Sequence, residues 1–535
     1  QFILYFLGLK TLPFFIKERS KYFEGVIKMR IGTSISTKKL DQACVEEYKI
    51  PLIVMMENAV LSAVKHLDTD LYDKYVIVSG VGNNGGDGLG IARQLKAKNK
   101  EVKVFLIGNM EKITQCSKTN LQILQAMKVE YEVICNNEDD NIKLENLKNN
   151  IKNSDVVIDC IFGTGLEREI KGIFKEVIKI INENKNLVYS IDVPSGINAT
   201  NGEILGICIK ADKTISFEFY KRGFLKYETK KYIGEVIVEH IGIPENILNK
   251  YDDKEYITTM NFVKNNIKIR NKFSFKSDFG KVTIFAGATG FTGAAYLSSE
   301  SAVKCGSGLV TVICDKEIQP ILSCKLSEAM TANYNEKERI DKLIKSSNVI
   351  GFGCGMGDTK ATLDMLHYLI NNANCHLVID ADGLNVLKND TSILKKYKNK
   401  IVITPHLGEM SRLTGESISY IQENKIDVAK SFAKENNIIV LLKGYETVIT
   451  DGYITYINPT GNSSMANGGM GDCLLGIITS FIGQGIDVFE AVVCAAFIHG
   501  YIGDELSKQL YTVNATDIIK KIPSTMKKFN IEINL

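Results

Sequence analysis

The sequence Tyr75-Val-Ile-Val-Ser-Gly-Val-Gly-Asn-Asn-Gly-Gly-Asp-Gly88 joins an apolar run to a loop of glycines and short polar residues. The run from Tyr75 to Ser79 predicts a buried strand, and the apolar residues between Ile91 and Leu95 predict a helix after the loop. Val102 to Ile107 predicts the next strand. A strand, a glycine loop, a helix and a second strand in this order predict a right-handed crossover and a mostly parallel sheet.

Two later apolar runs, residues 156–159 and 187–191, also lead into loops that combine Asp with Gly or Pro. Ligands of open α/β sheets bind at the carboxyl ends of the strands, so loops 82–88, 159–169 and 192–196 are expected to meet at one edge. The first loop lacks the glycine spacing of the dinucleotide fingerprint, and alone it is equally compatible with a structural turn. Together with the other two loops it favours a ligand site.

The second half of the chain repeats the pattern. Residues 281–286 predict a strand, residues 287–293 a glycine loop and residues 294–303 a helix. Further strands are predicted at residues 309–314, 348–352, 376–380, 401–404 and 438–442, with a hairpin-like segment at 448–456. This half is therefore also expected to be an α/β domain with a mostly parallel core.

The domain organisation follows from the regions where the pattern stops. Residues 242–277 are charged and rich in Asn, which is typical of a domain junction. We expect a first domain at 29–245, a junction at 246–277 and a second domain at 278–535. Residues 1–28 begin with a short apolar stretch that has no basic start or cleavage site, so we interpret them as a non-native or disordered leader.

The stretch Gly461-Asn-Ser-Ser-Met-Ala-Asn-Gly-Gly-Met-Gly-Asp-Cys-Leu-Leu-Gly476 predicts a glycine loop that opens an apolar helix. The backbone N–H groups at such a helix start attract anions, and glycines allow a phosphate to approach closely. Asp472 stands where that phosphate would bind, and a carboxylate there can take a proton from an attacking hydroxyl. Capping of the helix is an equally good explanation when the motif is considered alone.

Two single residues near other predicted strand ends are further candidates. Lys443 ends an apolar strand beside Gly444, so a position facing phosphate is favoured over a solvated charge. His406 follows Pro405, and a ligand contact and a satisfied loop residue are equally plausible for it. No other His or Cys lies close to it in the sequence, which argues against a transition-metal site.

The composition excludes several classes of function. Lys plus Arg number 65 and Asp plus Glu number 62, so the net charge of +3 gives no reason to expect nucleic acid or a membrane as a partner. The twelve cysteines form no Cys-x-x-Cys pair, and six of them lie among apolar or small residues: Cys160, Cys305, Cys314, Cys375, Cys473 and Cys494. This usage is typical of reduced thiols in a cytoplasmic protein.

With these motifs in hand, the chain resembles the bifunctional NAD(P)H-hydrate repair enzymes, in which an NAD(P)HX epimerase is fused to an NAD(P)HX dehydratase of ribokinase-like fold. The resemblance covers Met29 to the C-terminus and rests on seven motifs in family order: Met56-Glu-Asn-Ala59, Asn83-Asn-Gly-Gly-Asp87, Asp159-Cys-Ile-Phe-Gly-Thr-Gly165, Asp192-Val-Pro-Ser-Gly196, Pro405-His-Leu-Gly-Glu409, Lys443-Gly444 and the glycine run that ends at Asp472. It implies a Rossmann-like three-layer α/β sandwich followed by a ribokinase-like α/β domain.

For the first domain, the resemblance implies a site that binds the hydrate and epimerises its C6 centre. The implied hydrate-binding residues are Asn83, Asn84, Gly85, Gly86, Asp87, Gly163, Thr164, Gly165, Leu166, Glu167, Arg168, Glu169 and Asp192. Asn84, Asp159 and Ser195 are implied ligands of K⁺, and oxygen ligands suit a hard cation. Asp192 is the implied proton-transfer residue.

For the second domain, the resemblance implies phosphorylation of the C6 hydroxyl of the S hydrate, loss of phosphate and release of NAD(P)H and AMP. The implied nucleotide-binding residues are Lys443, Gly444, Tyr445, Glu446, Thr447, Asn462, Ser463, Ser464, Met465, Ala466, Asn467, Gly468, Gly469, Met470 and Gly471. Ala294, Gly355, His406 and Asp472 are implied hydrate contacts, with Asp472 as the base. ADP is the expected phosphoryl donor, with Mg²⁺, and a homo-oligomer is expected.

The sequence departs from the family pattern at a few positions. Val60 and Val81 replace residues that are commonly Gly and Pro, and Phe275-Lys-Ser277 replaces His-Lys-Gly. Ser463-Ser464 replaces an Asn-Pro-Gly style turn but leaves the later glycines and Asp472 in place. Two alternative functions remain at this point. One is a ribokinase-like small-molecule kinase that releases its phosphorylated product, and the other is a first domain that only binds a ligand.

Overall fold

The computed structural model describes residues 28–135, 140–184, 186–388 and 390–529, so the leader expected at residues 1–28 lies outside these ranges except for Lys28. The chain forms two compact units, one of residues 30–255 and one that begins at Tyr256. This division lies within the expected junction at 246–277. The junction holds regular elements, because α9 (Glu245–Tyr251) buries Ile247 and α10 (Met260–Asn266) buries Val263.

The first unit is built around a seven-stranded sheet of order β4-β3-β2-β5-β6-β7-β9, in which neighbouring strands are parallel. Its strands are β2 (Lys74–Ser79), β3 (Glu101–Ile107), β4 (Tyr131–Ile134), β5 (Val156–Cys160), β6 (Val188–Ile191), β7 (Lys213–Phe217) and β9 (Glu235–Glu239). Its longer helices are α2 (Ser34–Glu46), α3 (Leu52–Val64), α4 (Asn83–Ala97), α5 (Gln115–Ala126), α6 (Asp140–Asn153) and α7 (Ile173–Asn184). The short strands β1 (Met29–Gly32) and β8 (Tyr220–Lys221) also pair in parallel.

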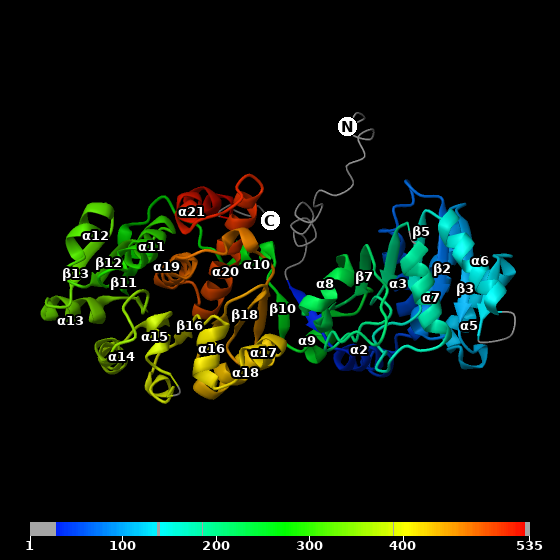
Figure 1. The fold of residues 1–535 in the computed structure, drawn as a ribbon, viewed down its shortest axis with the longest axis horizontal. Helices are drawn as coiled ribbons and strands as arrows, with labels where there is room; N and C mark the ends of the chain where they lie inside the picture. Colours follow the sequence, from blue (N-terminus) through cyan, green and yellow to red (C-terminus); the bar gives the residue numbers. More distant parts are fainter. Residues whose placement is uncertain (1–27, 136–139, 185, 389, 530–535) are drawn as a thin grey trace. The chain divides into compact units, whose positions relative to one another are not determined.

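Helices cover both faces of this sheet, as the sequence predicts for a three-layer sandwich (Figure 1). Apolar side chains of α2 to α5 pack with Ile77 and Ile158 on one face. Those of α6 and α7 pack with Val76 and Val157 on the other face. Because neighbouring strand residues alternate between the two covered faces, residues 75–78 of β2 and 156–158 of β5 are all apolar or aromatic.

The second unit has a larger sheet of order β13-β12-β11-β14-β15-β16-β17-β18-β19-β10, parallel from β13 to β17 and antiparallel from β17 to β19. Its strands are β10 (Glu255–Ile257), β11 (Lys281–Phe285), β12 (Leu309–Cys314), β13 (Met330–Asn333), β14 (Val349–Phe352), β15 (His376–Ile379), β16 (Ile401–Ile403), β17 (Ile439–Leu442), β18 (Thr447–Thr450) and β19 (Thr455–Asn458). Its longer helices are α11 (Thr292–Lys304), α13 (Lys337–Ser346), α14 (Lys360–Asn372), α16 (Leu407–Thr414), α18 (Lys425–Asn436), α19 (Met470–Gly483), α20 (Val488–Ser507) and α21 (Ala515–Phe529).

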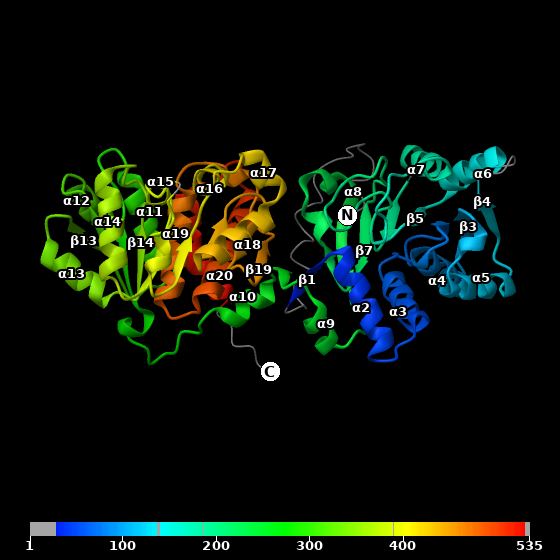
Figure 2. The ribbon, with the colours of Figure 1, turned by 90° about the horizontal axis from the view of Figure 1, so that it is seen from below.

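The core of the second unit lies between this sheet and the helices α11, α19, α20 and α21 (Figure 2). Helix α19 is buried from Cys473 to Gly483 because it lies between the sheet and α11, α20 and α21. Helix α13 contacts β11, and helix α18 contacts β17. The mostly parallel α/β architecture expected for this half is confirmed.

Helices α11 and α19 approach closely at one glycine, and this contact yields a stability prediction. A Cβ at Gly476 would lie 2.1 Å from both Ser298 O and Ser301 Oγ. Gly476→Ala should therefore destabilise the second unit by about 1–3 kcal/mol through overpacking. Gly293→Ala on α11 is the matched control, because a Cβ there has no atom within 4 Å. Thermal unfolding that is equally unaffected in both variants would contradict the close packing.

Candidate functional site

The glycine loop of the first unit is packed against its own strand and the neighbouring one. Helix α4 begins at Asn83 after the cap residue Gly82. A Cβ at Gly85 would lie 1.8 Å from Gly80 O, and a Cβ at Gly80 would lie 2.1 Å from Ile161 O. Only glycine fits at these contacts, so the loops that follow β2 and β5 meet at the carboxyl edge of the sheet.

Asp192 lies at the point where the three predicted loops come together. A Cβ at Gly163 would lie 3.3 Å from Asp192 Oδ2 and 3.2 Å from the Cβ of Asn84. The backbone of Asp192 is left-handed, with a φ of 65°, and such a conformation in a non-glycine residue is held by its surroundings. Lys221 Nζ lies 2.8 Å from Asp192 Oδ1, and the Lys221 side chain is 0% exposed.

Asp159 and Ser195 contact each other directly. Asp159 accepts hydrogen bonds from Ser195 Oγ at 2.6 Å and from Ser195 N at 2.9 Å, and Ser190 Oγ donates to it at 2.8 Å. Burial raises the pKa of this carboxyl, and the hydrogen bonds oppose the rise. Asn84 has a buried amide whose oxygen and nitrogen have no hydrogen-bond partner. A buried carboxylate and an unpartnered amide oxygen are donors that suit a hard monovalent cation.

Several carboxylates share the surroundings of Asp192. Burial raises the pKa of Asp41 to about 6, and the charge of Asp192 adds to the rise while Lys221 opposes it. Burial also raises the pKa of Asp87, to which Asp192 and Asp41 contribute. The sequence did not single out Asp41 or Lys221. Nothing in the local pattern marks them, because Asp41 is a polar residue within α2 and Lys221 follows an aromatic pair.

The loop from Gly163 to Glu169 has one side chain in the apolar core and several residues exposed to solvent. Leu166 belongs to the apolar core of the first unit, so a ligand could meet its backbone only. Gly165, Glu167 and Arg168 are exposed. Glu169 is exposed as well and pairs with Lys171 at 2.8 Å.

In the second unit, Gly471 directly precedes Asp472 and lies close to two further charged groups, those of Asp380 and Lys443. A Cβ at Gly471 would lie 3.2 Å from Asp380 Oδ2 and 3.4 Å from Lys443 Nζ. Helix α19 starts after Gly469, whose φ of 89° requires glycine, and this cap residue makes no side-chain capping hydrogen bond. The N–H groups of this helix start are therefore available to an anion.

Lys443 is held by two carboxylates, that of Asp380 directly after β15 and that of Glu409 in the first turn of α16. Its Nζ lies 2.7 Å from Asp380 Oδ1 and 3.9 Å from Glu409 Oε2. Burial raises the pKa of Asp472, and the negative charge of Asp380 raises it further. The Cys354 thiol and the ammonium group of Lys443 act in the opposite direction. The surroundings of Asp472 therefore include Lys443, Asp380 and the glycine loop, and its role as a base stays a prediction.

His406 caps the next helix. Its Nδ1 accepts hydrogen bonds from Gly408 N at 2.9 Å and Glu409 N at 3.1 Å, and Glu409 Oε2 accepts one from His406 N at 2.8 Å. Its side chain is 54% exposed, and Nε2 lies 3.5 Å from Glu409 Oε1. Gly355 and Ala294 are in contact, since a Cβ at Gly355 would lie 2.9 Å from that of Ala294.

Some side chains of the predicted nucleotide stretch hold the loop itself. Asn462 Nδ2 donates to Asp504 Oδ1 at 2.7 Å, and Asn467 Nδ2 donates to Val513 O at 2.7 Å. Met465 packs against Gly503, where an added Cβ would lie 2.1 Å from its sulfur. The stretch therefore offers mainly its backbone and its small residues to a ligand. In the other predicted nucleotide segment, Thr447 Oγ1 donates to Gly444 O at 2.9 Å.

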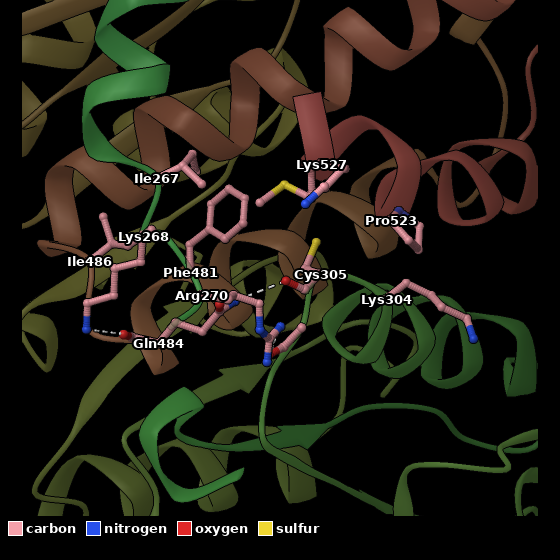
Figure 3. Close-up of a pocket in the computed structure, with 12 residues that line it drawn as sticks. Ile267, Lys268, Arg270, Lys304, Cys305, Phe481, Gln484, Ile486, Pro523 and Lys527 are labelled. Carbon is pink, nitrogen blue, oxygen red and sulfur yellow. Dashed lines mark hydrogen bonds between the residues drawn. The ribbon is translucent and has the colours of Figure 1, made fainter. Parts of the chain in front are cut away.

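A cavity of about 210 Å³ lies away from all of these residues, and none of the predicted site residues line it (Figure 3). Two of the basic side chains that line it donate hydrogen bonds to carbonyl groups at helix ends. Lys268 Nζ donates to the carbonyl of Gln484 at 2.7 Å, and Arg270 Nη1 donates to the carbonyl of Gly306 at 3.2 Å. These carbonyls follow the last turns of α19 and α11, where basic groups are favourable.

Within the described residues, the fold and the two candidate sites define a two-unit α/β enzyme with a cluster of carboxylates in one unit and a glycine loop at a helix start in the other. A family described as NAD(P)H-hydrate dehydratase matches residues 282–524, and one described as YjeF-related protein N-terminus matches residues 52–223. The chain belongs to the family of bifunctional NAD(P)H-hydrate repair enzymes.

Its relatives include the bifunctional NAD(P)H-hydrate repair enzyme Nnr of Moorella thermoacetica, which is 34% identical over 94% of this chain and 98% of its own length. The enzyme of the same name from Thermofilum pendens is 35% identical over 89% of this chain and 92% of its own length. Among solved structures, the ADP/ATP-dependent NAD(P)H-hydrate dehydratase of Bacillus subtilis, co-crystallised with ATP and Mg²⁺, is 26% identical and aligns with 51% of this chain and 98% of that chain at a TM-score of 0.47.

The shared surroundings of Asp41 and Asp192 predict how stability depends on pH. A carboxyl whose folded pKa lies near 6, above its ordinary value of 3.8, contributes stability at low pH that is lost as the pH rises through about 6. Asp41→Asn should therefore stabilise the first unit by about 1–3 kcal/mol more at about pH 7.5 than at about pH 4.

Calorimetric unfolding at the two pH values measures this difference. Asp70→Asn, which changes an exposed carboxylate of the same unit, is the control and should show no such pH dependence. An effect of Asp41→Asn that is the same at both pH values would show that Asp41 ionises normally.

Proposed function

We propose that this chain repairs hydrated nicotinamide cofactors. Its first unit interconverts R- and S-NAD(P)HX, and its second unit dehydrates S-NAD(P)HX to NAD(P)H with ADP, releasing AMP and phosphate. The observation that carries the proposal is the arrangement around Gly471, where Asp472, Lys443 and the free start of α19 meet. Family membership supplies the substrate.

In the proposed dehydration, Asp472 takes the proton of the C6 hydroxyl as that oxygen bonds to the β-phosphorus of ADP. The P–O bond to AMP breaks, and AMP leaves with its electron pair. Phosphate then leaves C6 and a ring proton is lost, which restores the ring double bond. Lys443 and the N–H groups of residues 468–471 stabilise the charge on the transferred phosphoryl group.

A bound Mg²⁺ would neutralise charge on the nucleotide phosphates. The site fits this requirement, because Asp380, Glu409 and Asp472 outnumber the single ammonium group of Lys443. Gly355, Ala294 and the exposed edge of His406 are proposed to contact the hydrate. Gly444 to Thr447 and Asn462 to Gly471 are proposed to contact the nucleotide, mainly through their backbone.

In the proposed epimerisation, Asp192 transfers a proton while residues 83–87 and 163–169 hold the hydrate. Lys221 holds the Asp192 carboxylate in place through their ion pair. Asn84, Asp159 and Ser195 would hold K⁺, which supplies a fixed positive charge beside the anionic substrate. The unpartnered amide of Asn84 supports this assignment.

The same second-unit site could serve a kinase that releases its phosphorylated product. The presence of the first unit and the Pro405-His-Leu-Gly-Glu409 motif favour repair. We also propose a cytoplasmic location and a homo-oligomer. The location is supported by the twelve cysteines, which all lie within the described residues and are not joined in disulfides there. In that part of the chain, every helix is too short or too polar to cross a bilayer.

The dehydratase assignment predicts that the chain with S-NADHX, ADP and Mg²⁺ regenerates NADH and releases an equal amount of inorganic phosphate. Asp472→Asn should lower the rate about 10²–10⁴-fold, because the base is lost. Asp364→Asn on the exposed face of α14 is the control. Coupled measurement of NADH absorbance and phosphate tests this outcome. A stable phosphorylated product without NADH would support the kinase instead.

The epimerase assignment predicts that Asp192→Asn blocks consumption of the R hydrate while S-hydrate dehydration continues. Chromatography that resolves the two hydrates during turnover measures both. The control is Asp70→Asn, which should consume both epimers. Unchanged R-hydrate consumption by Asp192→Asn would indicate a first unit that binds without catalysing.

A further inference from the structure

Asp380 lies in the dehydratase site, yet its sequence context did not assign it a role. It follows β15 and is buried, with 2% of its surface exposed. Its Oδ1 accepts hydrogen bonds from Lys443 Nζ at 2.7 Å and from Ala381 N at 2.8 Å. The carboxylate therefore connects the end of β15 to the lysine that ends β17.

The backbone around Asp380 is constrained to an uncommon conformation. Ala381 has a φ of 50°, which is left-handed and unfavourable for a residue with a Cβ. Gly353 has a φ of 121°, and a Cβ there would lie 2.0 Å from Asp380 O. Strained backbone of this kind persists only when the surrounding structure requires it, and here it fixes the direction of one carboxylate.

This carboxylate reaches the glycine loop as well as the lysine. Its Oδ2 would lie 3.2 Å from a Cβ at Gly471, and Lys443 Nζ would lie 3.4 Å from the same point. The absence of a side chain at Gly471 lets the Asp380–Lys443 pair stand directly against the backbone that precedes Asp472. Asp380 thus acts on both proposed catalytic elements.

Neutralising the charge of Lys443 does not by itself explain the position of the Asp380 carboxylate. Glu409 also faces Lys443 at 3.9 Å, and its side chain is 6% exposed. The groups that face Asp472 are Asp380, Asp382, Lys443 and the Cys354 thiol. His406 faces Glu409 on the far side of the pair. The carboxylates exceed the cations here, so the field of Asp380 favours proton uptake by Asp472.

We propose that Asp380 is a positioning residue of the dehydration reaction, which holds Lys443 against the glycine loop and strengthens Asp472 as a base. This inference rests on the proposed function of the second unit. Asp380 acts through Lys443 and Asp472. Loss of its charge should therefore move the pH profile of the reaction, which loss of a purely structural group would not do.

The test compares Asp380→Asn, which removes the charge, with Asp380→Glu, which keeps the charge and displaces the carboxylate. Each should lower kcat for S-NADHX with ADP about 10- to 100-fold, because Lys443 loses a well-aligned charge-assisted hydrogen bond. In Asp380→Asn, the acid limb of the pH profile of kcat/KM should move to lower pH, because one negative charge fewer faces Asp472. In Asp380→Glu, this limb should stay near its wild-type position.

Asp364→Asn is the control for substitution of a carboxylate outside the site. Turnover by Asp380→Asn within about twofold of wild type, or a slower enzyme whose acid limb has not moved, would overturn the proposal. If Asp380→Asn does not fold, a wild-type kcat in Asp380→Glu would overturn it equally. An inactive wild-type chain would refute the proposed function instead, so the two failures are distinguishable.

Discussion

A buried ion pair at the carboxyl edge of a parallel sheet is the constraint on which both sites depend. Lys221 Nζ lies 2.8 Å from Asp192 in the first unit, and Lys443 Nζ lies 2.7 Å from Asp380 in the second. A buried charge without a partner is strongly unfavourable, so each lysine fixes where its aspartate can be. Each pair stands beside a glycine, since a Cβ at Gly163 would lie 3.3 Å from Asp192 Oδ2 and a Cβ at Gly471 would lie 3.2 Å from Asp380 Oδ2. The sheets position these ion pairs. Each pair sets the charge at or around the aspartate that is proposed to transfer a proton.

The sequence predicts much of the fold because buried parallel strands are continuous apolar runs. The runs at residues 75–79 and 281–286 lie on β2 and β11. Two kinds of strand give no such signal. Edge strands such as β4 and β13 are only partly buried, so their residues are mixed. The central strand β7 buries hydroxyl groups of Thr and Ser, which interrupt its apolar pattern.

The candidate sites were predictable where a motif is local. Loops that combine Asp with glycine lead to the regions of Asp192 and Asp472 from sequence alone. Residues that reach a site from a distant element leave no local pattern. Lys221 ends the two-residue strand β8, Asp41 lies on α2, and Asp380 contacts Lys443, which is 63 residues away. Their significance depends on burial and on the charge of a partner, which only the folded chain defines.

The central claim is that one chain carries two complementary reactions on the same damaged cofactor. The most direct measurement is the extent of NADH recovery from an equal mixture of R- and S-NADHX with excess ADP and Mg²⁺, followed together with phosphate release. The account predicts that the whole mixture is converted in a rapid reaction, with phosphate released in a one-to-one ratio to NADH. A reaction that stops when the S hydrate is consumed, or phosphate that does not match NADH, would contradict it.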